Sequence, residues 1–270
     1  MLELRLGVIG AGFVGGAVIN AFNNNTVMLS IVDTNAKKAT CTFEEMMLEE
    51  PEAIFVCLPT PCTTKGDVNA SAIFEVLDKL LKDSYKGVVI IKSTITPDKV
   101  KEMKHNYPLH IVYNPEFLTE ANAHEDFKHP SMQILGGDWK DCEEAERIYL
   151  QHSDVKIVPT FKTDIVTASL LKYTINSWLA TKVVFMNELK ELHDRSGATS
   201  SWEQFSDMLR RDERIGDSHL KVPGPDGQYG FGGHCFPKDT TAFLEYARSL
   251  GADMEVLRYA VRKNNLLRGK

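Results

Sequence analysis

Three glycines between two strand-like runs constrain the fold of this chain more than any other feature. The apolar run from Leu4 to Ile9 predicts a buried strand, and the sequence GAGFVG from Gly10 to Gly15 follows it directly. Ala17 to Phe22 predicts a helix, and Thr26 to Val32 predicts a second strand that ends in Asp33. A strand, a glycine turn, a helix, a strand and an acid in this order predict a dinucleotide-binding unit.

Each glycine has a physical role in such a unit. Gly10 makes the tight turn, Gly12 lets the backbone approach a pyrophosphate, and Gly15 allows close packing of helix on strand. Asp33 lies 21 residues after Gly12, where a carboxylate binds a ribose 2′-hydroxyl and repels a 2′-phosphate. The pattern therefore favours NAD over NADP. The alternative is a glycine turn in another α/β fold.

Strand-like and helix-like segments go on alternating to about Val158, which predicts an α/β fold with a mostly parallel sheet, doubly wound and Rossmann-like. The further strands are expected at Ala53–Leu58, Gly87–Lys92, His110–Tyr113, Met132–Leu135 and Val155–Val158. The helices are expected at Ala70–Leu81, around Pro97, which we place one turn into its helix, and at Asp138–Gln151.

Polar residues follow the predicted strands at the points where each strand ends: Thr60, Ser93, Thr94, Glu116 and Glu120. In parallel sheets the ligand lies outside the carboxyl ends of the strands. Each of these residues alone could be a helix cap or a turn former. Their shared position at strand ends instead indicates a binding site.

The alternation stops near Val158, and the rest of the chain has helical periodicity. No Pro or Gly occurs from Thr163 to Ser196, and apolar residues recur there every three or four positions, which predicts one long helix at a domain junction or a dimer interface. Lys172 and Asn176 share a face of this helix, either as functional groups or as part of a solvated face. We expect two domains, residues 1–161 for dinucleotide binding and residues 162–270 as an all-helical domain that begins with the long helix.

Shorter helices are expected at Ser201–Leu209, Asp239–Leu250 and Asp253–Leu267, with a loop rich in Gly and Pro from Ile215 to Gly233. The stretch from Gly230 to Asp239 places three glycines and Lys238 around Cys235. Glycines let a backbone approach a ligand, and a nearby lysine favours the nucleophilic thiolate. The alternative is that Cys235 is a small buried apolar residue.

Composition excludes several classes of protein. The net charge of −6 provides no basic patch for nucleic acid, and no apolar run approaches the roughly 20 residues of a membrane span. The amino terminus leads directly into a strand-like run, so we expect no signal peptide. Five cysteines without a disulfide framework indicate a reduced, cytoplasmic protein. Cys57 and Cys62 lack the spacing of a zinc pair, and we expect no metal site.

Together the motifs resemble those of the UDP-glucose dehydrogenase family of nucleotide-sugar 6-dehydrogenases. The matching segments follow in order along the chain: Gly10–Gly15, Asp33, Pro59-Thr60-Pro61, Lys92-Ser93-Thr94, Asn114-Pro115-Glu116-Phe117-Leu118-Thr119-Glu120, Lys172 with Asn176, Asn187-Glu188, Arg214-Ile215-Gly216 and Gly230–Asp239. The segments that begin at Asn114 and at Gly230 are the most specific of these.

The resemblance implies a four-electron oxidation in which a sugar CH2OH becomes a carboxylate and two NAD are reduced, with UDP-glucose as the expected substrate. Cys235 would attack the intermediate aldehyde, and water would hydrolyse the resulting thioester. The residues that the resemblance implies as catalytic are Thr94, Glu116, Glu120, Lys172, Asn176, Cys235 and Asp239.

By the same resemblance, Lys172 and Asn176 stabilise the developing oxyanion, Thr94 and Asp239 hold a water, and Glu116 and Glu120 transfer protons. The implied cofactor-binding residues are Gly10, Ala11, Gly12, Phe13, Val14, Gly15, Asp33, Lys38, Pro59, Thr60, Ser93, Thr94, Glu120 and Lys238. The implied substrate-binding residues are Glu116, Phe117, Leu118, Lys172, Asn176, Arg214, Tyr229, Phe231 and Gly232. A homodimer built around the long helix is also implied, and Arg214 would reach substrate in its own or the neighbouring subunit.

The chain departs from the family pattern in three respects. Family members continue with a third domain over the nucleotide end of the substrate, whereas this sequence stops at Lys270. Ser169 and Met132 stand where a glutamate and an arginine are usual, and the loop from Gly224 to Tyr229 differs in length. The expected site is therefore better supported in its chemistry than in its substrate.

Two other functions stay open from the sequence. A two-electron β-hydroxyacid dehydrogenase shares the fold and a Lys-x-x-x-Asn pair on a long helix, but it needs no cysteine nucleophile. A truncated binding or assembly partner of a full-length relative would bind without turnover. Counting the NADH formed per sugar separates the three functions.

Overall fold

Residues 3–63, 66–119 and 122–269, which the computed structural model describes, include a seven-stranded sheet with the order β2-β1-β3-β4-β5-β6-β7. The strands are β1 Leu4–Ile9, β2 Val27–Val32, β3 Ala53–Val56, β4 Val88–Ile91, β5 His110–Tyr113, β6 Gln133–Gly137 and β7 Thr160–Thr163. Among the paired strands, only β5 and β6 run antiparallel. The predicted α/β fold with a mostly parallel sheet is confirmed.

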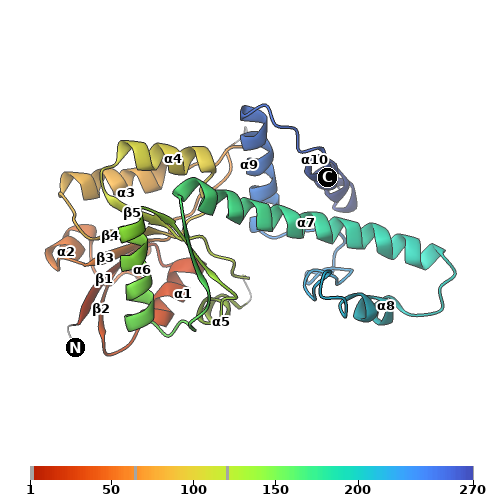
Figure 1. Ribbon diagram of the computed structural model, residues 1–270, viewed down its shortest axis with the longest axis horizontal. Helices are drawn as coiled ribbons and strands as arrows, with labels where there is room; N and C mark the ends of the chain where they lie inside the picture. Colours follow the sequence, from red (N-terminus) through yellow and green to blue (C-terminus); the bar gives the residue numbers. More distant parts are fainter. Residues whose placement is uncertain (1–2, 64–65, 120–121, 270) are drawn as a thin grey trace. The chain divides into compact units, whose positions relative to one another are not determined.

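Helices cover both faces of this sheet (Figure 1). They are α1 Phe13–Phe22, α2 Phe43–Leu48, α3 Ser71–Lys82, α4 Pro97–Asn106, α5 Ala123–Lys128 and α6 Trp139–His152. One apolar cluster joins the sheet to α2, α3 and α4, and a second joins the opposite face to α1, α5 and α6. The sheet is therefore doubly wound, as predicted.

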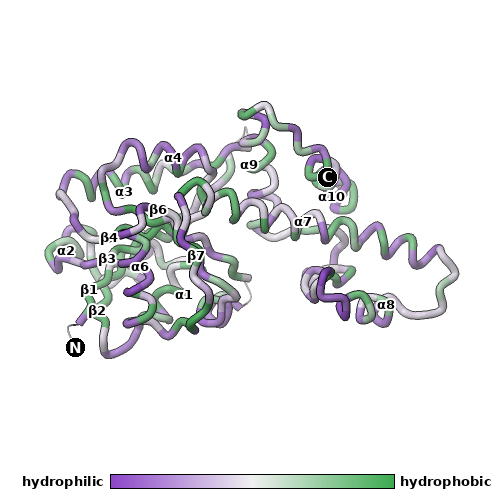
Figure 2. Tube along the Cα trace, in the orientation of Figure 1, coloured by the Kyte–Doolittle hydropathy of each residue, from purple (hydrophilic) through white to green (hydrophobic). Residues whose placement is uncertain are grey.

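Burial on both faces explains why the central strands are continuously apolar. Along β3, Ile54 and Val56 belong to the first cluster, whereas Ala53 and Phe55 belong to the second. All four side chains are fully buried, and the central strands β3 and β4 appear green in Figure 2. Complete burial of a side chain such as Phe55 contributes about 2 kcal/mol to stability.

The chain divides into two compact units, Met1–Pro61 with Val68–Lys172 and Cys62–Asp67 with Tyr173–Lys270. The division falls inside the long helix α7, Ile165–Arg195. The second unit continues with α8 Trp202–Leu209, α9 Cys235–Ser249 and α10 Glu255–Leu267. The domain boundary between residues 161 and 162 stays a prediction.

Small apolar clusters hold the second unit together. Ala180 and Val184 of α7 pack with Phe231 and with Ala260 of α10. The next turns of α7 pack with α8 and the following loop through Met186, Trp202, Leu220 and Val222. Within the described ranges, no helix combines the length and the apolar character that crossing a membrane requires.

Three predicted positions are wrong. Pro97 is the first residue of α4, where its missing N–H costs no helical hydrogen bond. The last strand is Thr160–Thr163, because pairing with β6 begins after Pro159, whereas Lys156 and Ile157 stay exposed.

The third error concerns α9, which begins at Cys235 and not at Asp239. Pro237 is tolerated in the first turn, where a helix leaves its N–H groups unpaired. The short helices α2 and α5 were not predicted, since six residues carry little periodicity.

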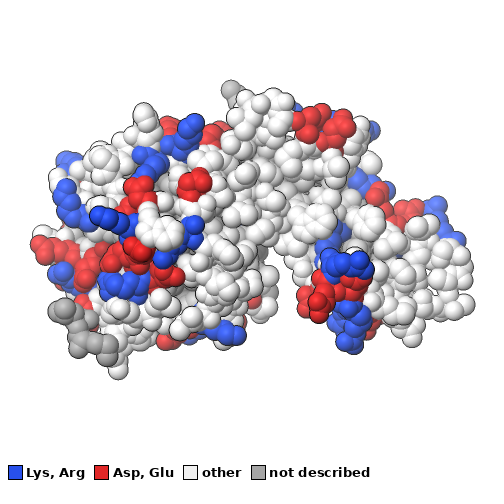
Figure 3. Space-filling model, in the orientation of Figure 1, with Lys and Arg blue, Asp and Glu red and all other residues white. Residues whose placement is uncertain are grey.

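Charged side chains of both signs intermingle over the α6 region on the face of the molecule in Figure 3. Arg147 pairs with Glu144 at 2.6 Å, and Lys162 pairs with Glu146 at 2.6 Å. These residues are half-buried at the surface, and surface ion pairs typically contribute up to about 1 kcal/mol each. Charges of opposite sign are therefore paired on this part of the surface.

Two adjacent glycines in α1 provide a matched test of the packing at the first turn. A Cβ on Gly15 would lie 1.8 Å from the Gly10 carbonyl oxygen, whereas a Cβ on Gly16 would meet nothing within 4 Å. We expect Gly15→Ala to lower the free energy of unfolding by about 1–3 kcal/mol through overpacking. Gly16→Ala should leave it unchanged or raise it by up to about 1 kcal/mol, because alanine favours a helix. Urea denaturation of both variants measures the difference, and equal losses would contradict this packing.

Candidate active site

The glycine turn leaves open backbone at the start of α1. Gly10 has φ +91°, a conformation that side chains disfavour, and a Cβ there would lie 2.7 Å from the Cys57 carbonyl oxygen. Gly12 is the N-cap residue of α1, and a Cβ there would meet nothing within 4 Å. An anion can therefore approach the N–H groups at this helix end, as a pyrophosphate requires.

Asp33 at the end of β2 is tied to the same turn. Its carboxylate accepts hydrogen bonds from the backbone N–H of Ala11 at 2.6 Å and of Asn35 at 2.7 Å. The bond from Ala11 lowers the pKa of Asp33 the most, the bond from Asn35 lowers it next, and the nearby Lys38 lowers it further. Lys38 Nζ donates to the Ala11 carbonyl at 2.9 Å. A carboxylate has about four acceptor positions, so capacity for a ribose hydroxyl remains.

A cavity of about 730 Å³ opens beside this turn, within the size range of cofactor sites. Its lining includes the predicted residues Gly10, Gly12, Phe13, Val14, Asp33, Lys38 and Pro59. It also includes Thr34, Leu58, Ala72, Glu75, Val76 and Lys79, which the sequence analysis missed. The residues from α3 carry no local motif, since only the sheet topology brings that helix to the cavity. Turn, acid and cavity together fit a dinucleotide.

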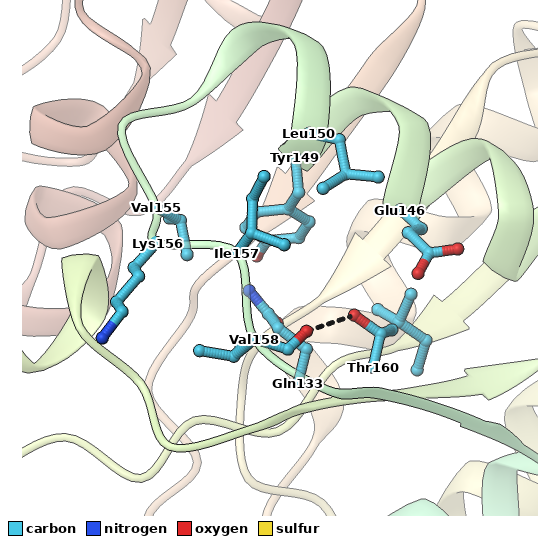
Figure 4. Close-up of a pocket in the computed structure, with 10 residues that line it drawn as sticks. Gln133, Glu146, Tyr149, Leu150, Val155, Lys156, Ile157, Val158 and Thr160 are labelled. Carbon is cyan, nitrogen blue, oxygen red and sulfur yellow. Dashed lines mark hydrogen bonds between the residues drawn. The ribbon is translucent and has the colours of Figure 1, made fainter.

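An adjoining cavity of about 490 Å³ shares Gly12, Phe13 and Lys38 and extends to Asn122 and His124 at α5. A separate crevice between α6, β6 and the segment before β7 is shown in Figure 4. Its volume of about 20 Å³ holds about one water molecule, so it cannot be a cofactor site.

Glu116, which follows β5, forms a buried ion pair with Lys172 in the same unit. Lys172 Nζ lies 3.1 Å from Glu116 Oε1 and also donates to the Glu116 carbonyl. Lys172 is only 2% exposed, which excludes the solvated face as its position. Burial raises the pKa of Glu116, but Lys172 and the N–H of Leu118 outweigh it and hold the pKa below its ordinary value. The Phe117 ring lies 5.1 Å from Lys172 Nζ.

Lys92 follows β4 and is a second buried lysine of the first unit, to which no role was assigned from the sequence. Lys92 Nζ donates to Asn114 Oδ1 at 2.9 Å and lies 5.0 Å from the Phe127 ring. The Tyr149 hydroxyl donates to the same Asn114 oxygen at 2.7 Å. Burial lowers the pKa of Lys92 to about 8. A charged residue at the end of an apolar strand was the signal that could have identified it.

The polar residues that follow β3 and β4 lie close together, and a buried serine of α7 adjoins them. Thr60 donates to the Thr94 carbonyl at 2.8 Å, which joins the ends of β3 and β4. Ser93 is buried, and its hydroxyl lies 3.5 Å from the Val56 carbonyl. Ser169 is fully buried and donates to the Ile95 carbonyl at 2.6 Å. Glu120 lies outside the residues that the structure describes.

The second unit places Cys235 at the start of α9, where the helix end favours a negative charge. Asp239 follows one turn later on the same face and is only 1% exposed. Its two oxygens accept from Asn176 Nδ2 at 2.6 Å and from Lys238 Nζ at 2.6 Å. The charge of Lys238 is therefore paired with that of Asp239. Asn176 and Asp239 are both buried and belong to the same polar network.

The predicted substrate residues of the second unit differ in exposure. Phe231 is buried, Gly232 is half-buried, and Tyr229 is 49% exposed. Arg214 is exposed and forms two hydrogen bonds with Asp212, at 2.9 and 2.6 Å. It is therefore available at the surface.

The predicted catalytic residues form two groups. Thr94, Glu116 and Lys172 belong to the first unit, whereas Asn176, Cys235 and Asp239 belong to the second. Lys172 and Asn176 lie one turn apart on α7. The assembly of both groups into one site stays a prediction.

Residues 38–153 match the NAD-binding domain of the UDP-glucose/GDP-mannose dehydrogenase family, and residues 166–266 match its central domain. The chain belongs to the UDP-glucose/GDP-mannose dehydrogenase family. The resemblance seen in the sequence is thus confirmed, the family is one of oxidoreductases, and NAD is the cofactor of its N-terminal domain.

Family relatives agree with this membership. UDP-glucose 6-dehydrogenase of Rickettsia bellii (strain RML369-C) is 34% identical over 230 residues, which are 83% of this chain and 51% of the relative. A UDP-glucose dehydrogenase structure from the archaeon Pyrobaculum islandicum has a TM-score of 0.80 at 25% identity, covering 98% of this chain and 68% of that one. The chain spans about half the length of the curated relatives that it matches.

A solved structure with a different printed name also shares the fold. The 3-hydroxyisobutyrate dehydrogenase of Mycobacterium tuberculosis has a TM-score of 0.75 at 15% identity, covering 97% of this chain and 92% of that one. At this identity the likeness concerns the fold alone.

The buried Lys92 predicts a pH-dependent contribution to stability. Its pKa of about 8 lies below its ordinary value of 10.5, so between these pH values the unfolded chain binds a proton that the folded chain does not. Stability should therefore rise with pH in this window, by about 3 kcal/mol from this group.

Lys92→Met should flatten that rise, whereas the matched control Lys86→Met, at an exposed position, should not. Urea denaturation from pH 7 to pH 10 measures the slopes. Equal slopes in the wild-type chain and Lys92→Met would contradict the burial of a charged group.

Proposed function

We propose that the chain catalyses the NAD-dependent oxidation of the C6 alcohol of a nucleotide sugar to a carboxylate, with UDP-glucose as substrate. The observation that carries the proposal is Cys235 at the start of α9, one turn from the buried Asp239, which binds Asn176 and Lys238. A nucleophilic thiol allows oxidation beyond the aldehyde, which a two-electron dehydrogenase does not need.

The proposed reaction balances as R-CH2OH + 2 NAD⁺ + H2O → R-COO⁻ + 2 NADH + 3 H⁺. NAD, held at the cavity lined by Gly12 and Asp33, would supply the hydride acceptor for both oxidation steps. The first step forms an aldehyde, and the Cys235 thiolate adds to its carbonyl carbon to give a thiohemiacetal. The second step removes the remaining hydride and forms a thioester. Water then breaks the C–S bond, which releases the acid and the thiol.

The polar groups have proposed roles in these steps. Lys172 and Asn176, one turn apart on α7, would stabilise the oxyanion of the thiohemiacetal. Glu116 is ionised beside Lys172 and would accept a proton from the alcohol. Thr94 and Asp239 would hold the hydrolytic water, and Glu120 would assist proton transfer. Lys238 would orient Asp239 through Oδ1, while Asn176 binds Oδ2.

The choice of UDP-glucose rests on relatives, since UDP-glucose 6-dehydrogenases of Rickettsia and Bacillus share 29–34% identity with this chain. These relatives are about twice as long as the region matched.

The decisive experiment counts NADH formed per UDP-glucose consumed. We expect two NADH with the wild-type chain, and Cys235→Ser should retain NAD binding but form no acid, because the thioester cannot form. Cys41→Ser, at another half-buried thiol, is the matched control and should behave like the wild type.

Other stoichiometries have definite meanings in this assay. One NADH per sugar would favour a two-electron dehydrogenase of the β-hydroxyacid type, whose fold the chain shares. NAD binding without turnover would favour a binding or assembly partner of a longer relative. Acid formation at the wild-type rate by Cys235→Ser would exclude the covalent mechanism.

We infer that the partner of this chain is a second copy, bound through α7. Trp178, Phe185 and Leu192 are 66%, 58% and 63% exposed and follow one another at intervals of seven residues. Residues seven apart lie on nearly the same helix face, so they form one apolar stripe. A two-fold interface is self-complementary, and such a stripe can pack against itself.

The stripe predicts a dimer that one charge disrupts. Sedimentation at micromolar concentration should show a dimer for the wild-type chain and a monomer for Phe185→Asp, because the aspartate would lose its hydration in the interface. Phe161→Asp, at a phenylalanine of similar exposure in β7, is the control and should stay dimeric. A monomeric wild type would defeat the proposal.

A further inference from the structure

Asn264, in the last turn of α10, has both amide atoms bonded to the backbone of one residue in the glycine-rich loop. Its Oδ1 accepts from the Phe231 N–H at 2.6 Å, and its Nδ2 donates to the Phe231 carbonyl at 3.1 Å. Asn264 is only 5% exposed. These two bonds fix Phe231 in both position and peptide orientation.

The glycines around Phe231 leave room for the side chains that hold it. Gly230 has φ +72°, and a Cβ there would lie 2.4 Å from Asn264 Oδ1. A Cβ on Gly232 would lie 2.8 Å from Nη1 of Arg268. Because these two glycines lack a Cβ, Asn264 and Arg268 can lie against the loop. We call Asn264, with its two hydrogen bonds to Phe231, the clamp.

Two further side chains brace the same loop. Asn187 Oδ1 of α7 accepts from the Gly230 N–H at 3.0 Å. Arg268 donates to the Gly230 carbonyl at 2.9 Å and binds Asp226 at 2.7 Å and Gln228 at 3.1 Å. The loop is held from α7 and from the end of α10 at the same time.

A short path of contacts connects the clamp to the thiol. The Phe231 ring is buried against Ala180, Val184 and Ala260. It also meets the Phe236 ring edge-on, with the ring centroids 6.1 Å apart. Phe236 adjoins Cys235, so the Phe231 ring packs against the first turn of α9.

We propose that Asn264 is a positioning residue for the Cys235 thiol, with Arg268 as a second brace of the same loop. The proposal rests on the function proposed above, because the thiol must meet an aldehyde carbon in a defined geometry. Asn264 itself touches no reacting atom, and it acts by holding Phe231 and, through Phe236, the first turn of α9. A displacement of about 1 Å at a reacting group can reduce a rate by about 10².

The test compares neighbouring asparagines in the full chain. Asn264→Leu removes both bonds but keeps the branching and the number of side-chain heavy atoms, and Asn265→Leu makes the same change at an exposed position. We expect kcat per folded molecule to fall by about 10² in Asn264→Leu, with NAD affinity retained, and to stay at the wild-type value in Asn265→Leu. Measurement well below the melting temperature of each variant excludes a loss of folded protein.

Alkylation of Cys235 by iodoacetamide, followed by mass spectrometry, separates position from reactivity. A loosened loop leaves the thiol at least as accessible, so the alkylation rate in Asn264→Leu should be equal or higher while kcat falls. A parallel fall of both rates, or an unchanged kcat, would overturn the proposal.

Arg268→Leu keeps the test valid if Asn264→Leu does not fold, with Arg262→Leu at an exposed position of α10 as its control. Amide hydrogen exchange of residues 224–234 should be faster in Arg268→Leu and in Asn264→Leu than in the two controls. This readout needs no turnover, so it tests the clamp even if the wild-type chain forms no NADH. Unchanged exchange in both variants would overturn the clamp, whereas absent NADH alone would overturn the proposed function.

Discussion

Parallel pairing of β1, β3 and β4 is the constraint on which the first unit depends. It brings the carboxyl ends of these strands to one edge of the sheet, with β2 beside β1. The glycine turn, Asp33 and the residues after β3 and β4 therefore gather at that edge, although they are far apart in sequence. The cavity beside the turn follows from this topology, since α3 crosses from β3 to β4 along its side.

Buried charges at this edge are stabilised only in pairs or networks. Lys172 with Glu116, and Lys92 with Asn114 and Tyr149, each exchange hydration for hydrogen bonds inside the protein. Such pairs often cost as much in desolvation as they return, so apolar residues would serve stability equally well. In the proposed reaction, Lys172 beside the Glu116 carboxylate would provide a fixed field for a developing charge.

Glycine-rich segments have a similar design in both units. In the first unit, Asp33 holds the turn through the Ala11 N–H, and in the second, Asn264 holds the loop through Phe231. A glycine segment gains freedom of approach but loses conformational entropy when it is ordered. Side-chain hydrogen bonds from the neighbouring strand end or helix offset that loss.

The sequence by itself determined the fold class, the dinucleotide turn with Asp33, the long helix and the family. These features depend on local periodicity and on motifs that are contiguous in the chain, which the amino-acid order expresses directly. Only the tertiary structure decided that Lys172 pairs with Glu116, that Lys92 is buried beside Asn114, and that Asn264 binds the backbone of Phe231. Locally, Asn264 lies in a polar helical segment, and nothing in that segment distinguishes it from Asn265. Its role arises from a contact with a residue 33 positions away, and such contacts depend on how helices pack.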